Sequence, residues 1–256
     1  MRRTSYFALG VHMLRLIITM TYLVLFLIVS LPIMGVLALI GLKNPSARDH
    51  AALRIVQWGF KGVIFLAGTK VTVIGRENIP EDEAVLFVGN HRSFFDVIIG
   101  YTQMKGLTGF ISKKEMAKVP SMSLWMKFLH CLFLDRSDIK EGMKTILAGI
   151  ELLKNGISLV VFPEGTRNTT EAPLLPFHEG SMKLATKSGV RVIPMVQCNT
   201  SAVFEDNHLL LRRRHTIIEF GEPIDLSTLS PEDKKHPGAY LQKIVEDIYL
   251  KNLELI

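Results

Sequence analysis

Cysteine is scarce in this 256-residue chain, and its histidines are not clustered. The two cysteines, Cys131 and Cys198, lie in separate apolar runs without a C-x-x-C partner. This spacing indicates neither a disulfide framework nor a zinc–cysteine site, and it fits a reducing, cytosolic environment. The eight histidines show no H-x-x-x-H or H-E-x-x-H spacing, so we predict no metal site.

Several functional motifs are also missing. The pattern G-x-S-x-G does not occur, which argues against a serine hydrolase. No nucleic-acid-binding motif is present, although the net charge is +6 and the pI is about 9.3. Basic proteins also meet anionic lipids and phosphorylated substrates. We therefore expect a lipid partner and no nucleic acid.

Charge is absent from residues 16–42. As one straight helix this stretch would be about 40 Å long, whereas the hydrocarbon core of a bilayer is about 30 Å thick. The stretch is too long for a secretory signal peptide and lacks a convincing cleavage site. It predicts a membrane anchor, and a helix over residues 47–66 is expected to lie on or beside the membrane.

The direction of this anchor is ambiguous, because basic residues flank it on both sides. Pro32 and Gly35 lie inside the stretch and could break it. A hairpin in one leaflet would keep both flanks on the cytoplasmic side, whereas a single tilted span would not. We favour the hairpin. The flanking basic residues are Arg2, Arg3, Arg15, Lys43, Arg48, Arg54 and Lys61.

From residue 70 onward, short apolar runs alternate with amphipathic segments. This pattern predicts an α/β fold with a mixed, largely parallel sheet flanked by helices. We divide the chain into an N-terminal membrane-anchoring helical segment, 1–67, and an α/β domain, 68–256. Strands are expected at 70–74, 84–88, 107–111, 131–134, 158–162, 190–196 and 216–220. Helices are expected at 96–104, 122–129, 140–154, 180–187 and 232–253.

Polar residues follow three of the predicted strands. His91 follows the second, Arg136 follows the fourth, and the turn Pro-Glu-Gly-Thr-Arg at 163–167 follows the fifth. In open α/β sheets, ligands bind beyond the carboxyl ends of the strands. If these strands are parallel neighbours, the three groups lie along one edge of the sheet.

The sequence GNHRSFFD at 89–96 has two interpretations. Ser93-x-x-Asp96 before an apolar run has the form of a helix capping box. Alternatively, His91 is a general base that Asp96 orients. Within one regular helix the two side chains would point about 140° apart. They can meet only if His91 lies in the turn before the helix and Asp96 in its first turn.

The 163–167 turn resembles an anion-binding loop. Gly165 allows close approach of the backbone to a ligand, and the guanidinium of Arg167 matches a phosphate. Arg136 could supply a second positive charge. The alternative is a structural ion pair between Glu164 and Arg167. The run 212–214 of three arginines either touches lipid headgroups or ends a solvated hairpin.

Four sequence blocks resemble the glycerolipid acyltransferases typified by 1-acylglycerol-3-phosphate acyltransferase. They are NHRSFFD at 90–96, FLDR at 133–136, FPEGTRN at 162–168 and VRVIPMV at 190–196. The match spans about residues 70–225, and the first and third blocks together are highly specific.

The resemblance implies an α/β acyltransferase fold and acyl transfer from acyl-CoA or acyl-ACP to a lysophospholipid hydroxyl. It implies His91 as the base and Asp96 as its partner. No cofactor beyond the acyl co-substrate is implied, and the expected location is a bacterial inner membrane with the catalytic domain on the cytoplasmic side. Lys114 is a further candidate for a donor or acceptor contact. The residues expected to handle the acceptor are Arg136, Glu164, Gly165, Thr166 and Arg167.

Three residues depart from the family pattern, and they leave the acceptor headgroup and chain preference open. Arg92 replaces a glutamine, Asn168 replaces a serine, and Arg191 stands where proline is frequent. Three alternatives also stay open: another lysolipid acceptor, a lipid hydrolase in which His91 activates water, and a non-catalytic phospholipid-binding protein.

Overall fold

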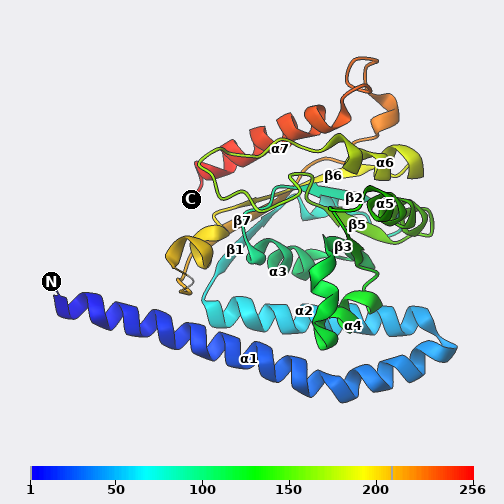
Figure 1. The fold of residues 1–256 in the computed structure, drawn as a ribbon. Helices are drawn as coiled ribbons and strands as arrows, with labels where there is room; N and C mark the ends of the chain where they lie inside the picture. Colours follow the sequence, from blue (N-terminus) through cyan, green and yellow to red (C-terminus); the bar gives the residue numbers. More distant parts are fainter. Residues whose placement is uncertain (1, 209) are drawn as a thin grey trace.

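A seven-stranded sheet forms the centre of the molecule, in the order β1-β7-β6-β2-β5-β3-β4 (Figure 1). The computed structural model describes residues 2–208 and 210–256, with side chains from residue 9 onward. The predicted basic flank at Arg2 and Arg3 therefore lies outside the described side chains. All neighbouring strands pair in parallel except β6 and β7, so the predicted mixed, largely parallel sheet is confirmed.

All seven predicted strands are present, with ends that shift by a few residues. Apolar runs bounded by turn residues locate buried strands well, because both faces of a parallel sheet are covered. The strands are β1 (Lys70–Ile74), β2 (Leu86–Gly89), β3 (Thr108–Lys113), β4 (Leu132–Leu134), β5 (Ser158–Val161), β6 (Val192–Cys198) and β7 (His215–Phe220).

Helices cover both faces of the sheet, and each face has its own apolar core. Alternate residues of β2 point to opposite cores: Phe87 belongs to one, and Leu86 and Val88 belong to the other. The first core is closed by α2 (Pro45–Ala67), α3 (Phe94–Gln103) and α4 (Pro120–Phe128). The second is closed by α5 (Ile139–Lys154), α6 (Lys183–Ser188) and α7 (Pro237–Leu253).

Two predicted helices begin later than expected. The closing helix begins at Pro237 rather than at residue 232, because proline suits the first helical position, where its missing N–H is not needed. The segment predicted as a helix at 180–187 starts with a 3₁₀ turn, Glu179–Met182, before α6.

The N-terminal anchor differs from the prediction. Helix α1 (Arg2–Lys43) is continuous through Pro32, and Figure 1 shows that it bends in its C-terminal half rather than folding back. The hairpin predicted inside residues 16–42 is therefore wrong. The chain reverses at Asn44 instead, whose side chain accepts a 3.0 Å hydrogen bond from Ala47 N, and Pro45 takes the first position of α2.

The two N-terminal helices are attached to the α/β layer by side-chain contacts. Tyr22 of α1 donates to Gly59 O of α2 at 3.3 Å, and Trp125 of α4 donates to Ser30 Oγ of α1 at 3.1 Å. Gln57 of α2 donates to two carbonyls at the C-terminal end of α3. Helix α2 shares an apolar core with α3, so no break in packing marks residues 67 and 68. The division of the chain into an anchoring segment, 1–67, and an α/β domain, 68–256, stays a prediction.

Candidate active site

The turn between β2 and α3 carries the GNHRSFFD sequence. Ser93 is the N-cap of α3: its Oγ accepts from Phe95 N at 3.0 Å, and the Asp96 carboxylate accepts from Ser93 N at 2.7 Å. The capping box predicted from the sequence is thus present. The turn before it places His91 outside the helix.

The capping box coexists with a direct contact between His91 and Asp96. His91 Nδ1 lies 2.9 Å from Asp96 Oδ2, and the Asp96 side chain is fully buried. The Asp96 carboxylate therefore favours the tautomer that carries hydrogen on Nδ1, which leaves Nε2 of the imidazole with a lone pair. The His91 side chain is 19% exposed, so a substrate can approach it.

Asp96 is held by four donors. Its Oδ2 accepts from Arg92 N and Ser93 N, each at 2.7 Å, as well as from His91. Its Oδ1 accepts from Thr200 Oγ1 at 2.6 Å. Buried carboxylates need such donors to stay ionised, and an ionised Asp96 can stabilise the imidazolium that forms when His91 takes a proton.

The imidazole ring of His91 is fixed from its face as well. It stacks on the ring of Phe162, with centroids 4.3 Å apart and an angle of 9° between the planes. Phe162 directly follows β5, which is the parallel neighbour of β2. The position of the ring is therefore set by two adjacent strand ends.

Glu164 stabilises the His91 turn through a hydrogen bond to its backbone. It is buried, and its two oxygens accept from His91 N at 2.7 Å and Leu175 N at 2.8 Å. Burial raises the pKa of the Glu164 carboxyl, and the two backbone hydrogen bonds oppose that rise. These contacts give Glu164 a structural role at the His91 turn. Its predicted contact with the acceptor stays a prediction.

In the 163–167 turn, Thr166 is exposed, and Gly165 and Arg167 are half-buried. Gly165 has φ +71°, a backbone conformation that favours glycine, and a Cβ at this position would make a tight 3.1 Å contact with the His178 ring. Arg167 Nη1 donates to Glu205 Oε1 at 3.1 Å, and the guanidinium lies 4.2 Å from the centroid of the Phe94 ring. The alternative pairing of Arg167 with Glu164 is therefore wrong.

Arg136 and Lys114 lie farther along the same edge. Arg136 follows β4, which is separated from β2 by β5 and β3. At about 4.8 Å between neighbouring strands, β4 lies roughly 14 Å from β2. Arg136 is exposed, with no hydrogen bond among the described residues. Lys114 pairs with Asp135 at 2.5 Å, and this contact lowers the pKa of the Asp135 carboxyl.

Arg92 and Asn168, two of the residues that depart from the family pattern, hold the loop at residues 170–173, which follows the 163–167 turn. Arg92 donates to Thr170 O at 2.6 Å and to Ala172 O at 3.0 Å. Asn168 donates to Ala172 O at 2.8 Å, and its N–H donates to His91 O at 2.7 Å. This loop is thereby fastened to the His91 turn. Arg191 lies elsewhere, where it pairs with Glu83.

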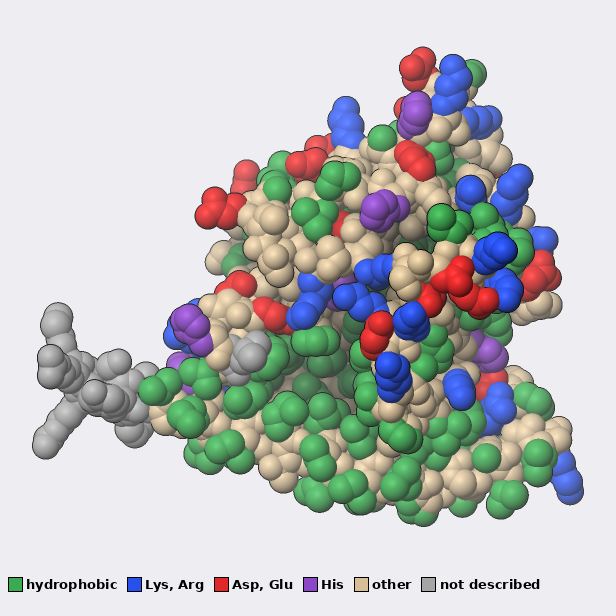
Figure 2. Space-filling model, viewed as in Figure 1, with side chains coloured by type: hydrophobic (Ala, Val, Ile, Leu, Met, Phe, Trp, Pro, Cys, Tyr) green, Lys and Arg blue, Asp and Glu red, His purple; other side chains and the backbone are tan. Residues whose placement is uncertain are grey.

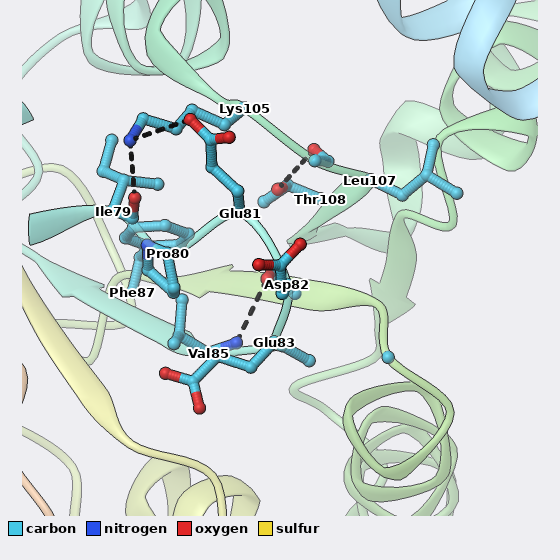
Figure 3. Close-up of a pocket in the computed structure, with 14 residues that line it drawn as sticks. Ile79, Pro80, Glu81, Asp82, Glu83, Val85, Phe87, Lys105, Leu107 and Thr108 are labelled. Carbon is cyan, nitrogen blue, oxygen red and sulfur yellow. Dashed lines mark hydrogen bonds and ion pairs between the residues drawn. The ribbon is translucent and has the colours of Figure 1, made fainter. Parts of the chain in front are cut away.

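A cavity of about 150 Å³ lies at the other edge of the sheet. Its lining includes Val85, Leu107 and Ser158, which precede or begin β2, β3 and β5 at their amino ends. Figure 3 shows Glu81, with its carboxylate beside the Lys105 ammonium, at this cavity. The cavity contains none of the predicted site residues and is separate from the His91 turn.

Three residues of the site were not predicted from the sequence. Gln197 is the last but one residue of β6, Thr200 follows that strand, and Glu205 begins a 3₁₀ turn farther along the chain. Gln197 Nε2 donates to Asp96 O at 2.9 Å, and Asn90 joins β2 to β6 through two 2.8 Å hydrogen bonds with the Gln197 backbone. The only feature of the sequence that could have indicated these three residues was their position at or after the carboxyl end of β6, which runs parallel to β2.

Comparison with known proteins assigns the family. The Acyltransferase family model matches residues 70–197. A 1-acyl-sn-glycerol-3-phosphate acyltransferase from Saccharomyces cerevisiae is 32% identical over 82% of this chain and 69% of its own. One of the same name from Borreliella burgdorferi is 29% identical over 75% of each chain.

The fold has a close counterpart among solved structures. The 1-acyl-sn-glycerophosphate acyltransferase PlsC from Thermotoga maritima superposes with a TM-score of 0.78 over 94% of this chain and 97% of its own, at 24% identity.

The chain belongs to the acyltransferase family. It is an enzyme that transfers an acyl group, and the resemblance predicted from the four sequence blocks is confirmed.

Proposed function

We propose that the protein transfers an acyl chain from acyl-CoA or acyl-ACP to the free hydroxyl of 1-acyl-sn-glycerol 3-phosphate, giving phosphatidic acid. The observation that carries this proposal is the His91–Asp96 pair at 2.9 Å, with Arg167 beyond the neighbouring strand. A base and a phosphate-binding cation on adjacent strand ends suit an acceptor with a hydroxyl close to a phosphate. The names of the relatives support the same acceptor.

In this mechanism His91 Nε2 takes the proton of the acceptor hydroxyl as its oxygen attacks the thioester carbonyl carbon. Asp96 stabilises the imidazolium that results. The tetrahedral intermediate collapses as the C–S bond breaks, and the departing thiolate takes the proton back from His91. One ester is formed and one thiol is released, without an acyl-enzyme.

We assign acceptor binding to Arg167 and Arg136, and the shape of the binding turn to Gly165 and Thr166. The fork of Arg167 can hold two phosphate oxygens. Glu164 contributes through the backbone of His91, whereas Lys114 is mostly engaged by Asp135.

We further propose that α1 and α2 place the enzyme on the cytoplasmic side of a bacterial inner membrane. The part of α1 at Leu9–Lys43 is long and apolar enough to cross a bilayer. Figure 2 shows apolar side chains gathered over the N-terminal helices, while charged side chains gather over the α/β layer. Exposed Trp58 and Phe65 extend the apolar surface onto α2.

A labelled acyl donor and a panel of lysolipids, given to the purified protein in detergent, test the proposal. Lysophosphatidate should be esterified, and His91→Ala should lower turnover by about 10²- to 10⁴-fold. Asp96→Asn should also impair turnover. Release of free fatty acid without loss of acceptor would instead indicate a hydrolase. Near-normal activity of both variants would contradict the reactive-pair interpretation, and a wild-type protein that binds lysolipid without turnover would be a binding protein.

A further inference from the structure

Glu205 contacts both the His91 turn, between β2 and α3, and the 163–167 turn after β5. It begins the 3₁₀ turn Glu205–Asn207, in the connection between β6 and β7. Its side chain is 17% exposed. A carboxylate that is this far buried needs donors to offset the loss of hydration.

Three donors from two turns converge on this carboxylate. Oε2 accepts from Ser93 Oγ at 2.7 Å. Oε1 accepts from Phe94 N at 2.8 Å and from Arg167 Nη1 at 3.1 Å. Glu205 is therefore a direct bridge between the first residues of α3 and the arginine of the 163–167 turn.

Helix capping accounts for only part of the role of Glu205, which accepts from Phe94 N at the start of α3. Ser93 and Asp96 already form a complete capping box at the start of α3. The additional partner that Glu205 brings is Arg167. This side chain is 36% exposed and would otherwise sample many rotamers. Glu205 and the Phe94 ring fix it, while Nε and Nη2 make no hydrogen bond within the described part of the chain.

We propose that Glu205 is a positioning residue of acyl transfer, which rests on the function proposed above. It holds the Arg167 guanidinium at a fixed place relative to His91. An acceptor whose phosphate lies on the free side of Arg167 then presents its hydroxyl to His91 Nε2. Glu205 thereby favours acceptors with a defined spacing between phosphate and hydroxyl, since binding geometry sets the effective concentration of the two reacting groups.

Steady-state kinetics of Glu205→Ala, with lysophosphatidate and acyl-CoA varied separately, test this role. The acceptor KM should rise about 10-fold, the loss expected when a charge-assisted hydrogen bond no longer holds the ligand-binding group. The donor KM should change little. Glu205→Gln should retain most of the activity, because its amide oxygen can accept from Phe94 N and Arg167 while its NH₂ group donates to Ser93 Oγ.

Asp206→Ala is the matched control. Asp206 is the next residue of the same turn, and among the described residues its carboxylate accepts only from Ser201 Oγ, at 2.8 Å. A cycle with Arg167→Ala gives the decisive comparison, since the effect of Glu205→Ala on the acceptor KM should vanish once Arg167 is absent.

Where Glu205→Ala differs from Asp206→Ala, two results would still overturn the role. One is an unchanged effect of Glu205→Ala in the Arg167→Ala background. The other is an equal rise in both KM values with a lower Tm in Glu205→Ala and Glu205→Gln alike, which indicates a structural role. If the wild-type protein esterifies no lysophosphatidate, the proposed function fails. If it does, and Glu205→Ala behaves like Asp206→Ala, the inference alone fails.

Discussion

Thr200 donates a 2.6 Å hydrogen bond to Oδ1 of Asp96 across 104 positions of the sequence. The other oxygen of Asp96 already accepts from His91 and from two backbone N–H groups. The carboxylate that hydrogen-bonds His91 is thus fixed from two sides, by the turn that precedes α3 and by the segment after β6.

Removing the Thr200 hydroxyl should slow the chemical step. Thr200→Val preserves the shape but leaves Oδ1 of Asp96 buried without a donor, which is worth about 1.5–3 kcal/mol for a charged acceptor. We expect kcat to fall about 10- to 100-fold with little change in the acceptor KM. Thr200→Ser should retain most of the activity. Equal losses in the two variants would show that the hydroxyl is not the important group.

Replacing Arg167 should weaken acceptor binding. If the guanidinium holds the phosphate in both the ground state and the transition state, Arg167→Ala should raise the acceptor KM about 10- to 150-fold and leave kcat comparatively unchanged. Arg167→Lys should recover part of this loss, since a point charge cannot replace the fork. Arg136→Ala should have a smaller effect, because Arg136 is exposed and its charge is screened.

Thermal unfolding of the same preparations separates binding from stability. Arg167 is partly exposed and pairs with Glu205, so its loss should lower Tm only slightly. A large drop in Tm with a normal acceptor KM would contradict the phosphate-binding role.

The buried carboxyl of Glu164 should make stability depend on pH. Its pKa is raised in the folded protein, mainly by burial. The folded state therefore holds this proton more tightly than the unfolded chain does, and the linked stability is present below the unfolded pKa of 4.5 and lost as pH rises through the folded pKa.

Urea unfolding of the wild type and of Glu164→Gln over this pH range tests the linkage. The variant should be less stable throughout, because an amide provides one acceptor for two backbone N–H groups. The advantage of the wild type should shrink as pH rises and then become constant. An advantage that grows with pH would contradict the direction of the shift.

The contacts of α1 predict which side of the membrane its ends face. Tyr22 and Ser30, in the middle of α1, contact α2 and α4, and a span through the bilayer centre would break both contacts. Cysteines placed at Gly10 and Lys43 of protein in sealed vesicles should therefore be labelled from the same side. The native Cys131 and Cys198 are buried and give a low background. Labelling from opposite sides would establish a true span.

Sequence patterns were sufficient for the sheet and for the gathering of His91, Asp96 and Arg167 at one edge of it. The apolar runs located every strand, because a sheet covered on both faces requires continuous apolar residues. His91, Asp96 and Arg167 were predictable because each follows a strand within a short motif. The hydrogen bond from Thr200 and the ion pair with Glu205 were not, because residues that join distant turns carry no local pattern.

For the N-terminal helix, the local sequence predicted a break that the structure does not contain. Pro32 suggested a break, but a long apolar helix can lose one backbone hydrogen bond and bend. The reversal occurs at Asn44 and Pro45, where capping chemistry favours a helix start. With the reversal at this position, α1 packs along α2.

Helix α3 is short, about 15 Å for ten residues, and its two ends have different attachments. At its first turn Asp96 holds the base. At its last turn, Tyr101 O and Met104 O accept from Gln57 Nε2 of α2, at 3.1 and 2.7 Å. Helix α3 thus links α2 to the carboxylate partner of the His91 imidazole. A shift of α2 relative to the sheet would therefore displace Asp96, and with it the imidazole of His91.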